Sequence, residues 1–322
     1  MRFRAISIRF LISMALGVAT LCATAAYAAA EADAASCPPQ PTPPTAELML
    51  KAQAQATDRG FLWQISRDGR DSFLYGTLHA GRPEWLALGP RTEASLYRTG
   101  VLALELNMTD PAVVQSMQGV MQGPARTVPA ELMQSLRAAW AAECLPPDDL
   151  TEGALELRVA QIEAARAQRL GLFPMYGAEF VLLMRSLGRR QPVVGLESVE
   201  TQMSAMLARS DEEAVDMVRD ALAELQRPSA GATLERLTRD WERSDLQDLE
   251  AYGDWCDCRS TEGEREALSR LLDGRNPGMA DAIERLHKDQ SVFAAVGSLH
   301  MVGPKGLPAL LKAKGFEVRR VF

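Results

Sequence analysis

Two segments of this chain share one pattern, a short apolar run followed by Gly-x-x-His. The first runs from Ser72 to Gly76 and reaches His79, and the second runs from Val292 to Gly297 and reaches His300. Apolar runs of this length that end in glycine predict buried strands that break into turns. In open α/β sheets, residues just past the carboxyl ends of the strands form the ligand sites. The two histidines are therefore predicted to belong to one site, the alternative being that each satisfies only its own turn.

Two glutamates occur in similar contexts. Glu105 ends the run Val101-Leu-Ala-Leu, and Glu197 follows Val193-Val-Gly-Leu. A carboxylate in an apolar strand costs several kcal/mol unless it is paired or bound to a metal. A salt bridge to an arginine would satisfy each one singly. Together with the histidines they form a His/Glu/Glu/His set, and neutral imidazoles with carboxylates suit a divalent ion with an open coordination position.

The order of the predicted elements gives the fold class. We expect an α/β (α+β) fold, with a central mixed sheet, a strand–Gly-x-x-His unit at each end of the folded region, and large helical insertions between them. The segment 61–78 is predicted to be a hairpin that turns at Asp68-Gly69. Mostly helical segments are expected up to residue 190 and from 198 to 287, with Asn276-Pro277 as cap and first turn of a helix. A last helix over 306–313 and a last strand over 316–322 complete the pattern.

These residues carry a resemblance to a known family. The chain resembles the TraB/PrgY/GumN family, to which the Tiki metalloproteases are related, and more distantly the erythromycin-esterase and haem-binding ChaN-like proteins. The resemblance covers the chain from about Phe61 to its end. The blocks that match are Leu74-Tyr-Gly-Thr-Leu-His79, Leu102-Ala-Leu-Glu105, Val194-Gly-Leu-Glu197 with Gln202, Arg275-Asn276 with Met279-Ala280, Ala295-Val-Gly-Ser-Leu-His300-Met-Val-Gly303, and the segment 306–318. One departure is Tyr176-Gly-Ala-Glu179, where the family pattern has Gly-x-Asp.

The resemblance implies two Gly-x-x-His motifs with an essential glutamate, and metal-dependent hydrolysis of peptide bonds in the Tiki branch. We therefore expect His79, Glu105 and His300 to hold a divalent ion, manganese, zinc or cobalt. Glu197 or Glu105 would act as general base, and Arg275 would stabilise developing negative charge. Two alternatives stay open. One is a metal-independent esterase-type hydrolase with histidine as base, and the other is a non-catalytic protein that binds haem or a peptide signal.

The amino-terminal region predicts export. Residues 1–28 combine Arg2, Arg4 and Arg9 with an apolar stretch and Ala26-Tyr-Ala28, as in a cleaved signal peptide. Residues 29–45 are rich in proline and alanine and are predicted to be a tether before a single domain over 46–322. Removing three arginines and no acid from a chain of formal charge −7 would leave −10, which opposes nucleic-acid binding. We expect a periplasmic or secreted protein, with no stable membrane insertion after cleavage and a peptide or protein as substrate.

Four cysteines would remain after cleavage, Cys37, Cys144, Cys256 and Cys258. An even number in an oxidising compartment predicts two disulfides, and four cysteines allow three connectivities. Because a bridge between Cys256 and Cys258 would close a very small ring, we expect each of them to pair elsewhere. A soft-metal site at this Cys-x-Cys is the less favoured alternative, since no second cysteine pair completes it.

Overall fold

The computed structural model describes residues 37–121, 126–147, 150, 153–227, 231–259 and 261–322. The predicted signal segment lies outside the described residues, as does the first part of the predicted tether. The part that is described, residues 37–45, forms neither helix nor strand. Among the described residues, no helix is long and apolar enough to cross a membrane.

A six-stranded mixed sheet with large helical insertions forms the centre of the fold, as the sequence predicts. Its strands lie in the order β4-β3-β5-β2-β1-β6. Their bounds are β1 Phe61–Arg67, β2 Arg70–Thr77, β3 Val101–Leu104, β4 Val193–Gly195, β5 Val292–Gly297 and β6 Glu317–Arg320. The outer strand β6 pairs antiparallel with β1, and β1 pairs antiparallel with β2.

Strands β1 and β2 form the predicted hairpin. Asp68 and Gly69 both have positive φ, 52° and 74°. This is the backbone conformation that a two-residue hairpin turn of the favoured twist requires, and Asp-Gly adopts it at little cost. The hairpin fixes the direction of β2 and therefore the point at which its Gly-x-x-His turn begins.

The other half of the sheet is parallel. Strand β5 lies between β2 and β3 and is parallel to both, and β4 is parallel to β3. All six residues of β5 and all four of β3 are buried. Strands covered on both faces are uniformly apolar for this reason, so they show no alternation in the sequence. Because β4, β3, β5 and β2 run in one direction, their carboxyl ends lie along the same edge of the sheet.

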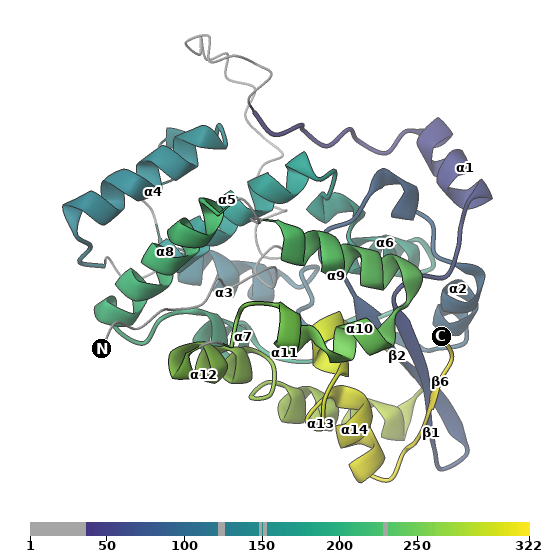
Figure 1. The fold of residues 1–322 in the computed structure, drawn as a ribbon. Coiled ribbons are helices and arrows are strands. Elements are labelled where there is room, and N and C mark those ends of the chain that lie inside the picture. Colours follow the sequence, from purple (N-terminus) through teal and green to yellow (C-terminus); the bar gives the residue numbers. More distant parts are fainter. Residues whose placement is uncertain (1–36, 122–125, 148–149, 151–152, 228–230, 260) are drawn as a thin grey trace.

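Helices surround this sheet and fill the insertions between the strands (Figure 1). Their bounds are α1 Ala46–Ala54, α2 Pro90–Tyr97, α3 Pro111–Met121, α4 Ala130–Ala142, α5 Leu155–Arg169, α6 Ala178–Gly188, α7 Val199–Met206, α8 Asp211–Leu225, α9 Ala232–Arg243, α10 Leu246–Glu250, α11 Tyr252–Trp255, α12 Glu262–Leu271, α13 Asn276–Asp289 and α14 Leu307–Ala313. Short 3₁₀ turns occur at η1 Pro83–Trp85, η3 Pro174–Tyr176 and η4 Ser298–Met301.

The helical insertions divide the apolar interior. Helices α4, α5 and α8 pack together on the side of the molecule away from β6 (Figure 1) and share a core that includes Leu136, Trp140 and Ile162. The sheet has a larger core of its own, made by the strands together with α6, α9, α13 and α14. A smaller cluster that includes Leu106, Met117 and Met203 packs beside the end of β3.

The structure contains two disulfides, Cys37–Cys144 and Cys256–Cys258. The expectation that Cys256 and Cys258 pair elsewhere is wrong. Asp257, the residue between them, adopts a left-handed φ of 52°. This turns the chain so that the two Cα atoms lie 5.1 Å apart, within the usual range for a disulfide. The small ring is therefore accommodated by one residue in an uncommon backbone conformation.

Candidate functional site

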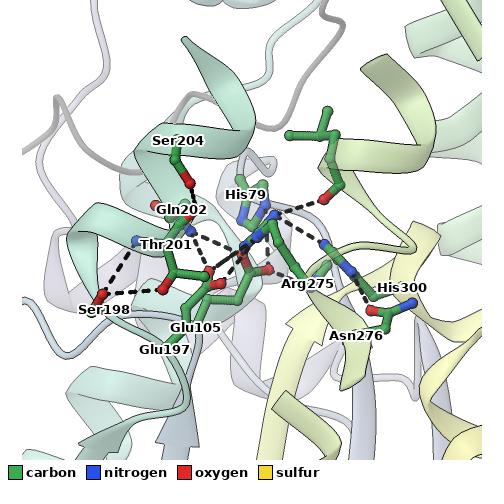
Figure 2. Close-up of polar contacts among 12 residues, drawn as sticks. His79, Glu105, Glu197, Ser198, Thr201, Gln202, Ser204, Arg275, Asn276 and His300 are labelled. Atoms are coloured by element: carbon green, nitrogen blue, oxygen red, sulfur yellow. Dashed lines mark hydrogen bonds and ion pairs between the residues drawn. The ribbon is translucent and has the colours of Figure 1, made fainter. Parts of the chain in front are cut away.

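The four residues predicted from strand ends lie at one edge of the sheet. Glu105 directly follows β3, and Glu197 comes two residues after β4. His79 comes two residues after β2, and His300 lies in the 3₁₀ turn η4 that follows β5. The side chains gather at this edge because the four strands are parallel neighbours. Figure 2 shows all four residues pointing toward one centre.

Arg275 occupies that centre. Its guanidinium Nη2 donates to both Glu105 and Glu197, and its Nε lies 3.1 Å from Glu197 Oε2. Its Nη1 lies 3.2 Å from His300 Nε2. The arginine side chain is 2% exposed and both carboxylates are 5% exposed. A single buried cation therefore links two carboxylates and one imidazole.

Glu105 is fully hydrogen-bonded. Oε1 accepts the backbone N–H of Gly297 at 2.9 Å, and Oε2 accepts from Arg275 and from Gln202 Nε2, the latter at 3.1 Å. Burial alone would raise the pKa of this carboxyl, but the charge of Arg275, with contributions from His79 and the backbone N–H of Gly297, outweighs burial and holds the pKa of Glu105 well below its usual range. The surroundings of Glu105 therefore favour its ionised form.

Glu197 differs from Glu105 although both bind the same arginine. Burial is the largest effect on it, and the net result is a raised pKa for Glu197. It has no backbone donor of the kind that Gly297 gives Glu105, and the negative charge of Glu105 also opposes its ionisation. Two neighbouring carboxyls whose pKa values are pushed apart are typical of an acid–base site. Of the two, Glu197 is better suited to exchange a proton.

Asn276 fixes the ring of His300. The Asn276 amide Nδ2 donates to the Lys305 carbonyl at 2.8 Å, which directs Oδ1 to His300 Nδ1 at 2.6 Å. Nδ1 must then carry the proton, and the lone pair of Nε2 faces Arg275. Burial and the arginine charge lower the pKa of His300 to about 3, so the ring is neutral at physiological pH.

This contact also corrects the sequence analysis, which assigned Asn276 to a helix cap. In the structure α13 begins at Asn276 itself, and no side chain makes the cap hydrogen bond. The side-chain oxygen faces His300 instead, so the Asn276 side chain orients this imidazole rather than capping the helix.

His79 lies between two acids. Its Nδ1 is 2.7 Å from Glu179 Oε1, and its Nε2 is 4.0 Å from Glu105 Oε1. Burial lowers the pKa of His79, but Glu179 and Glu105 outweigh this and raise it to about 9. Neither ring nitrogen makes a hydrogen bond of good geometry with the residues that the structure describes. Buried polar atoms in this condition are uncommon, and at a functional site they suggest a missing ligand.

The side chains of this centre are of the kinds that bind divalent cations, but they are not arranged around one point as in a metal site. Within the described ranges, no three His, Cys, Asp or Glu side chains surround a common point as metal ligands would. The guanidinium of Arg275 already occupies Oε2 of Glu105, and the backbone N–H of Gly297 donates to Oε1. The Nε2 atoms of both histidines nevertheless point into the centre. His79 Nε2, which has no hydrogen-bond partner among the described residues, faces Glu105, and the lone pair of His300 Nε2 faces Arg275. Two imidazoles and one carboxylate suit zinc, cobalt or manganese.

The centre is buried, and its most accessible flank is α7. His300 is 0% exposed and His79 is 5% exposed. Gln202, which donates 3.1 Å hydrogen bonds to Glu105 and Glu197, is part-buried on α7, and its neighbour Thr201 is exposed. A cavity of about 200 Å³ lies elsewhere, among residues of α5, α8 and α9, and shares no residue with the centre. The side chains around the centre therefore become more exposed toward α7, past Glu197 and Gln202.

Sequence reasoning assigned no role to Gln202, Asn276 or Glu179 in this centre. Gln202 and Asn276 belong to the sequence blocks that resemble the TraB/PrgY/GumN family. Each lies close in sequence to a predicted site residue. Glu179 was set aside because Asp is expected at its position. In the structure it is 1% exposed and accepts from Thr77 Oγ1 as well as facing His79. The longer glutamate therefore occupies the place from which an acid can orient the histidine.

Comparison with known proteins agrees with this geometry. The profile of the TraB/PrgY/gumN family matches residues 61–320. The chain belongs to this family. It is 22% identical over 243 residues to the uncharacterized protein YbaP of Shigella flexneri, covering 76% of this chain and 88% of that protein. The uncharacterized protein YbaP of Escherichia coli K12 gives the same identity and coverage. No solved structure is significantly similar to the chain.

Proposed function

We propose that this family member is an exported metal-dependent hydrolase that cleaves peptide bonds at the centre formed by His79, Glu105, Glu197, Arg275 and His300. The observation that most supports this proposal is the orientation of the two imidazoles. A Glu179 oxygen faces Nδ1 of His79, and the Asn276 oxygen faces Nδ1 of His300. The Nε2 atom of each ring faces the centre. Metal-binding histidines in proteins have this arrangement, because the outer acceptor fixes the tautomer and the ring direction.

His79, Glu105 and His300 would hold a divalent ion, with manganese, zinc and cobalt as the candidates. Such an ion would supply Lewis-acid polarisation of the scissile carbonyl and acidify a water molecule. Binding it would remove the proton that His79 carries in the metal-free protein, since only neutral imidazole is a ligand. A bound cation and Arg275 would compete for Glu105, so the guanidinium would keep mainly its contacts with Glu197.

Glu197 is the proposed general base. Its raised pKa brings it closer to neutrality than Glu105, and it lies on the accessible α7 side of the centre. It would take a proton from the attacking water and return it to the leaving amine. Gln202 holds Glu197 and Glu105 together through one amide nitrogen. Arg275 would stabilise the negative charge that develops on the carbonyl oxygen.

Peptide bonds are proposed as the substrate class because the Tiki branch of the family suggests them. A periplasmic or secreted location is proposed from the leader-like residues 1–28 and from the two disulfides, which persist in oxidising compartments.

The test is a peptidase assay on the parent protein and on Glu197→Gln, with and without chelator and with manganese, zinc or cobalt added back. The parent should lose activity with chelator and regain it with one of the metals. Glu197→Gln should be about 10²–10⁴-fold slower at an unchanged metal content, because the proton acceptor is lost while the amide oxygen can still accept from Arg275. A fully loaded parent that cleaves no peptide in a diverse peptide mixture would refute the proposal.

One observation favours a second candidate, a metal-independent hydrolase. Arg275 already supplies a cation between Glu105, Glu197 and His300. In this candidate a histidine of the centre would act directly as the base, with Arg275 holding the developing oxyanion. Activity that survives exhaustive chelation, and that is lost in His300→Ala, would select this candidate.

A further inference from the structure

The large apolar side chains that are exposed gather on one face. Among the described residues, those most exposed are Met49 and Leu50 of α1, Met184 and Leu187 of α6, and Tyr97 of α2, at 44–72%. Single exposed apolar residues are common on protein surfaces, whereas a group confined to one face indicates an interaction. We call this group, with the basic residues described below, the α1/α2/α6 face.

Contacts between the three helices show that the face is continuous. Arg185 of α6 donates to Gln53 of α1 at 3.0 Å, and it lies 4.0 Å from Glu93 of α2. Glu93 in turn accepts from Tyr97 at 3.0 Å. The guanidinium of Arg189 stacks 3.8 Å above the Tyr97 ring. On α1, Met49 and Gln53 are one helical turn apart and therefore lie on the same side.

The face is basic although the chain is acidic. Arg185, Arg189 and Arg190 of α6 and its end belong to this face, against one acid, Glu93. Glu47 and Lys51 are one turn apart on the other side of α1, where their charges offset each other. Two further arginines at its border, Arg91 and Arg98, are paired with Asp58 and Asp71. The whole chain has a formal charge of −7. Locally positive charge on an acidic protein indicates an anionic partner.

We propose that the α1/α2/α6 face adsorbs to an anionic phospholipid surface. Apolar side chains interleaved with arginine and lysine are the composition of segments that lie in the membrane interface, where the apolar groups enter the acyl boundary and the cations meet lipid phosphates. This is peripheral binding, which needs no membrane-crossing helix. It is independent of the reaction at the buried centre.

The charge of the face disfavours a second copy of this chain as the partner. An isologous dimer through this face would bring two surfaces of net positive charge together, and their arginines would repel each other. A lipid surface needs no shape complementarity, so a small apolar group supported by charge is sufficient.

The test is co-sedimentation of the purified protein with vesicles of phosphatidylglycerol and phosphatidylcholine in a 3:7 ratio, and with phosphatidylcholine alone. The parent should bind the anionic vesicles and lose most binding at high salt. Replacing Arg189 and Arg190 together with glutamine should weaken binding roughly 30-fold, about fivefold for each charge near the surface. Met49→Ser with Leu50→Ser should weaken it on the order of tenfold.

The matched control is Arg219→Gln with Arg227→Gln, which removes the same charge from exposed residues at α8 and its end, on the side of the molecule opposite α1 (Figure 1). It should bind as the parent does, and all variants should keep the parent's melting temperature. Equal binding to both vesicle types, an equal loss in the control, or a parent dimer that becomes a monomer in Arg189→Gln with Arg190→Gln would each overturn the proposal.

Discussion

Replacing Arg275 with methionine tests how the centre is held together. The change keeps most of the side-chain volume but removes the cation that links Glu105 and Glu197. All three side chains are at most 5% exposed, so water cannot replace the lost contacts. Removing one partner of a buried ion pair costs about 3–5 kcal/mol. Because one guanidinium serves two carboxylates, we expect a loss in free energy of unfolding near the upper end of that range at pH 8.

The loss should depend on pH with a definite sign. Without the arginine, burial and mutual repulsion raise the folded-state pKa of Glu105 and Glu197 above about 4.5. An acid whose pKa is higher in the folded than in the unfolded state contributes to the free energy of unfolding below its unfolded pKa. That contribution is lost as pH rises. In the parent the pKa of Glu105 is lowered, so the stability that it contributes is lost only below its unfolded pKa of 4.5 and hardly changes between pH 8 and pH 5. The difference between parent and variant should be smaller at pH 5 because the variant regains stability there.

Urea unfolding of chelator-treated protein at the two pH values measures the difference. The control is Arg209→Met, which breaks an ion pair with Glu266 whose side chains are 58% and 62% exposed. It should cost only about 0.2–1 kcal/mol at either pH. A cost below about 1 kcal/mol for Arg275→Met at pH 8, or a cost that does not shrink at pH 5, would refute the reasoning.

Three further predictions concern other parts of the molecule. Asn276→Ala should lower activity about 10–100-fold with unchanged disulfides, because His300 loses the acceptor that fixes its tautomer, and Asn276→Asp should recover part of it in steady-state kinetics. Replacing Cys37 and Cys144 with serine should lower the free energy of unfolding by about 2–4 kcal/mol, measured by urea denaturation, since the bridge spans 107 residues. Mass spectrometry of protein recovered from its native host should give a mature chain that starts near Ala29, and an intact Met1 would contradict export.

The sheet and the placement of the four site residues were predictable from sequence for a physical reason. Parallel strands are buried on both faces, so they read as apolar runs, and a polar residue at the end of such a run stands out. His79, Glu105 and His300 follow such strands, and Glu197 follows the equally apolar but only part-buried edge strand β4. The hairpin turn was equally predictable from sequence, because Asp68-Gly69 can adopt the positive φ angles that the turn requires and few dipeptides can.

What the sequence did not reveal depends on contacts between distant segments. Asn276 bonds His300 across 24 residues, and Glu179 reaches His79 and Thr77 across about a hundred. No local pattern distinguishes an asparagine that caps a helix from one that orients an imidazole. The pairing of Cys256 with Cys258 was missed because ring size was weighed without the left-handed conformation of Asp257. The central position of Arg275 was likewise invisible, although the residue itself was singled out.

The central claim is that His79, Glu105 and His300 hold a catalytic divalent ion. The most direct measurement is calorimetric titration of manganese, zinc and cobalt into chelator-treated parent, His79→Ala, His300→Ala and, as a control outside the centre, His287→Ala. The parent and His287→Ala should each bind one ion per chain, and the other two variants should lose that binding. Binding that is absent from the parent, or that survives in His79→Ala and His300→Ala, would contradict the proposed metal site.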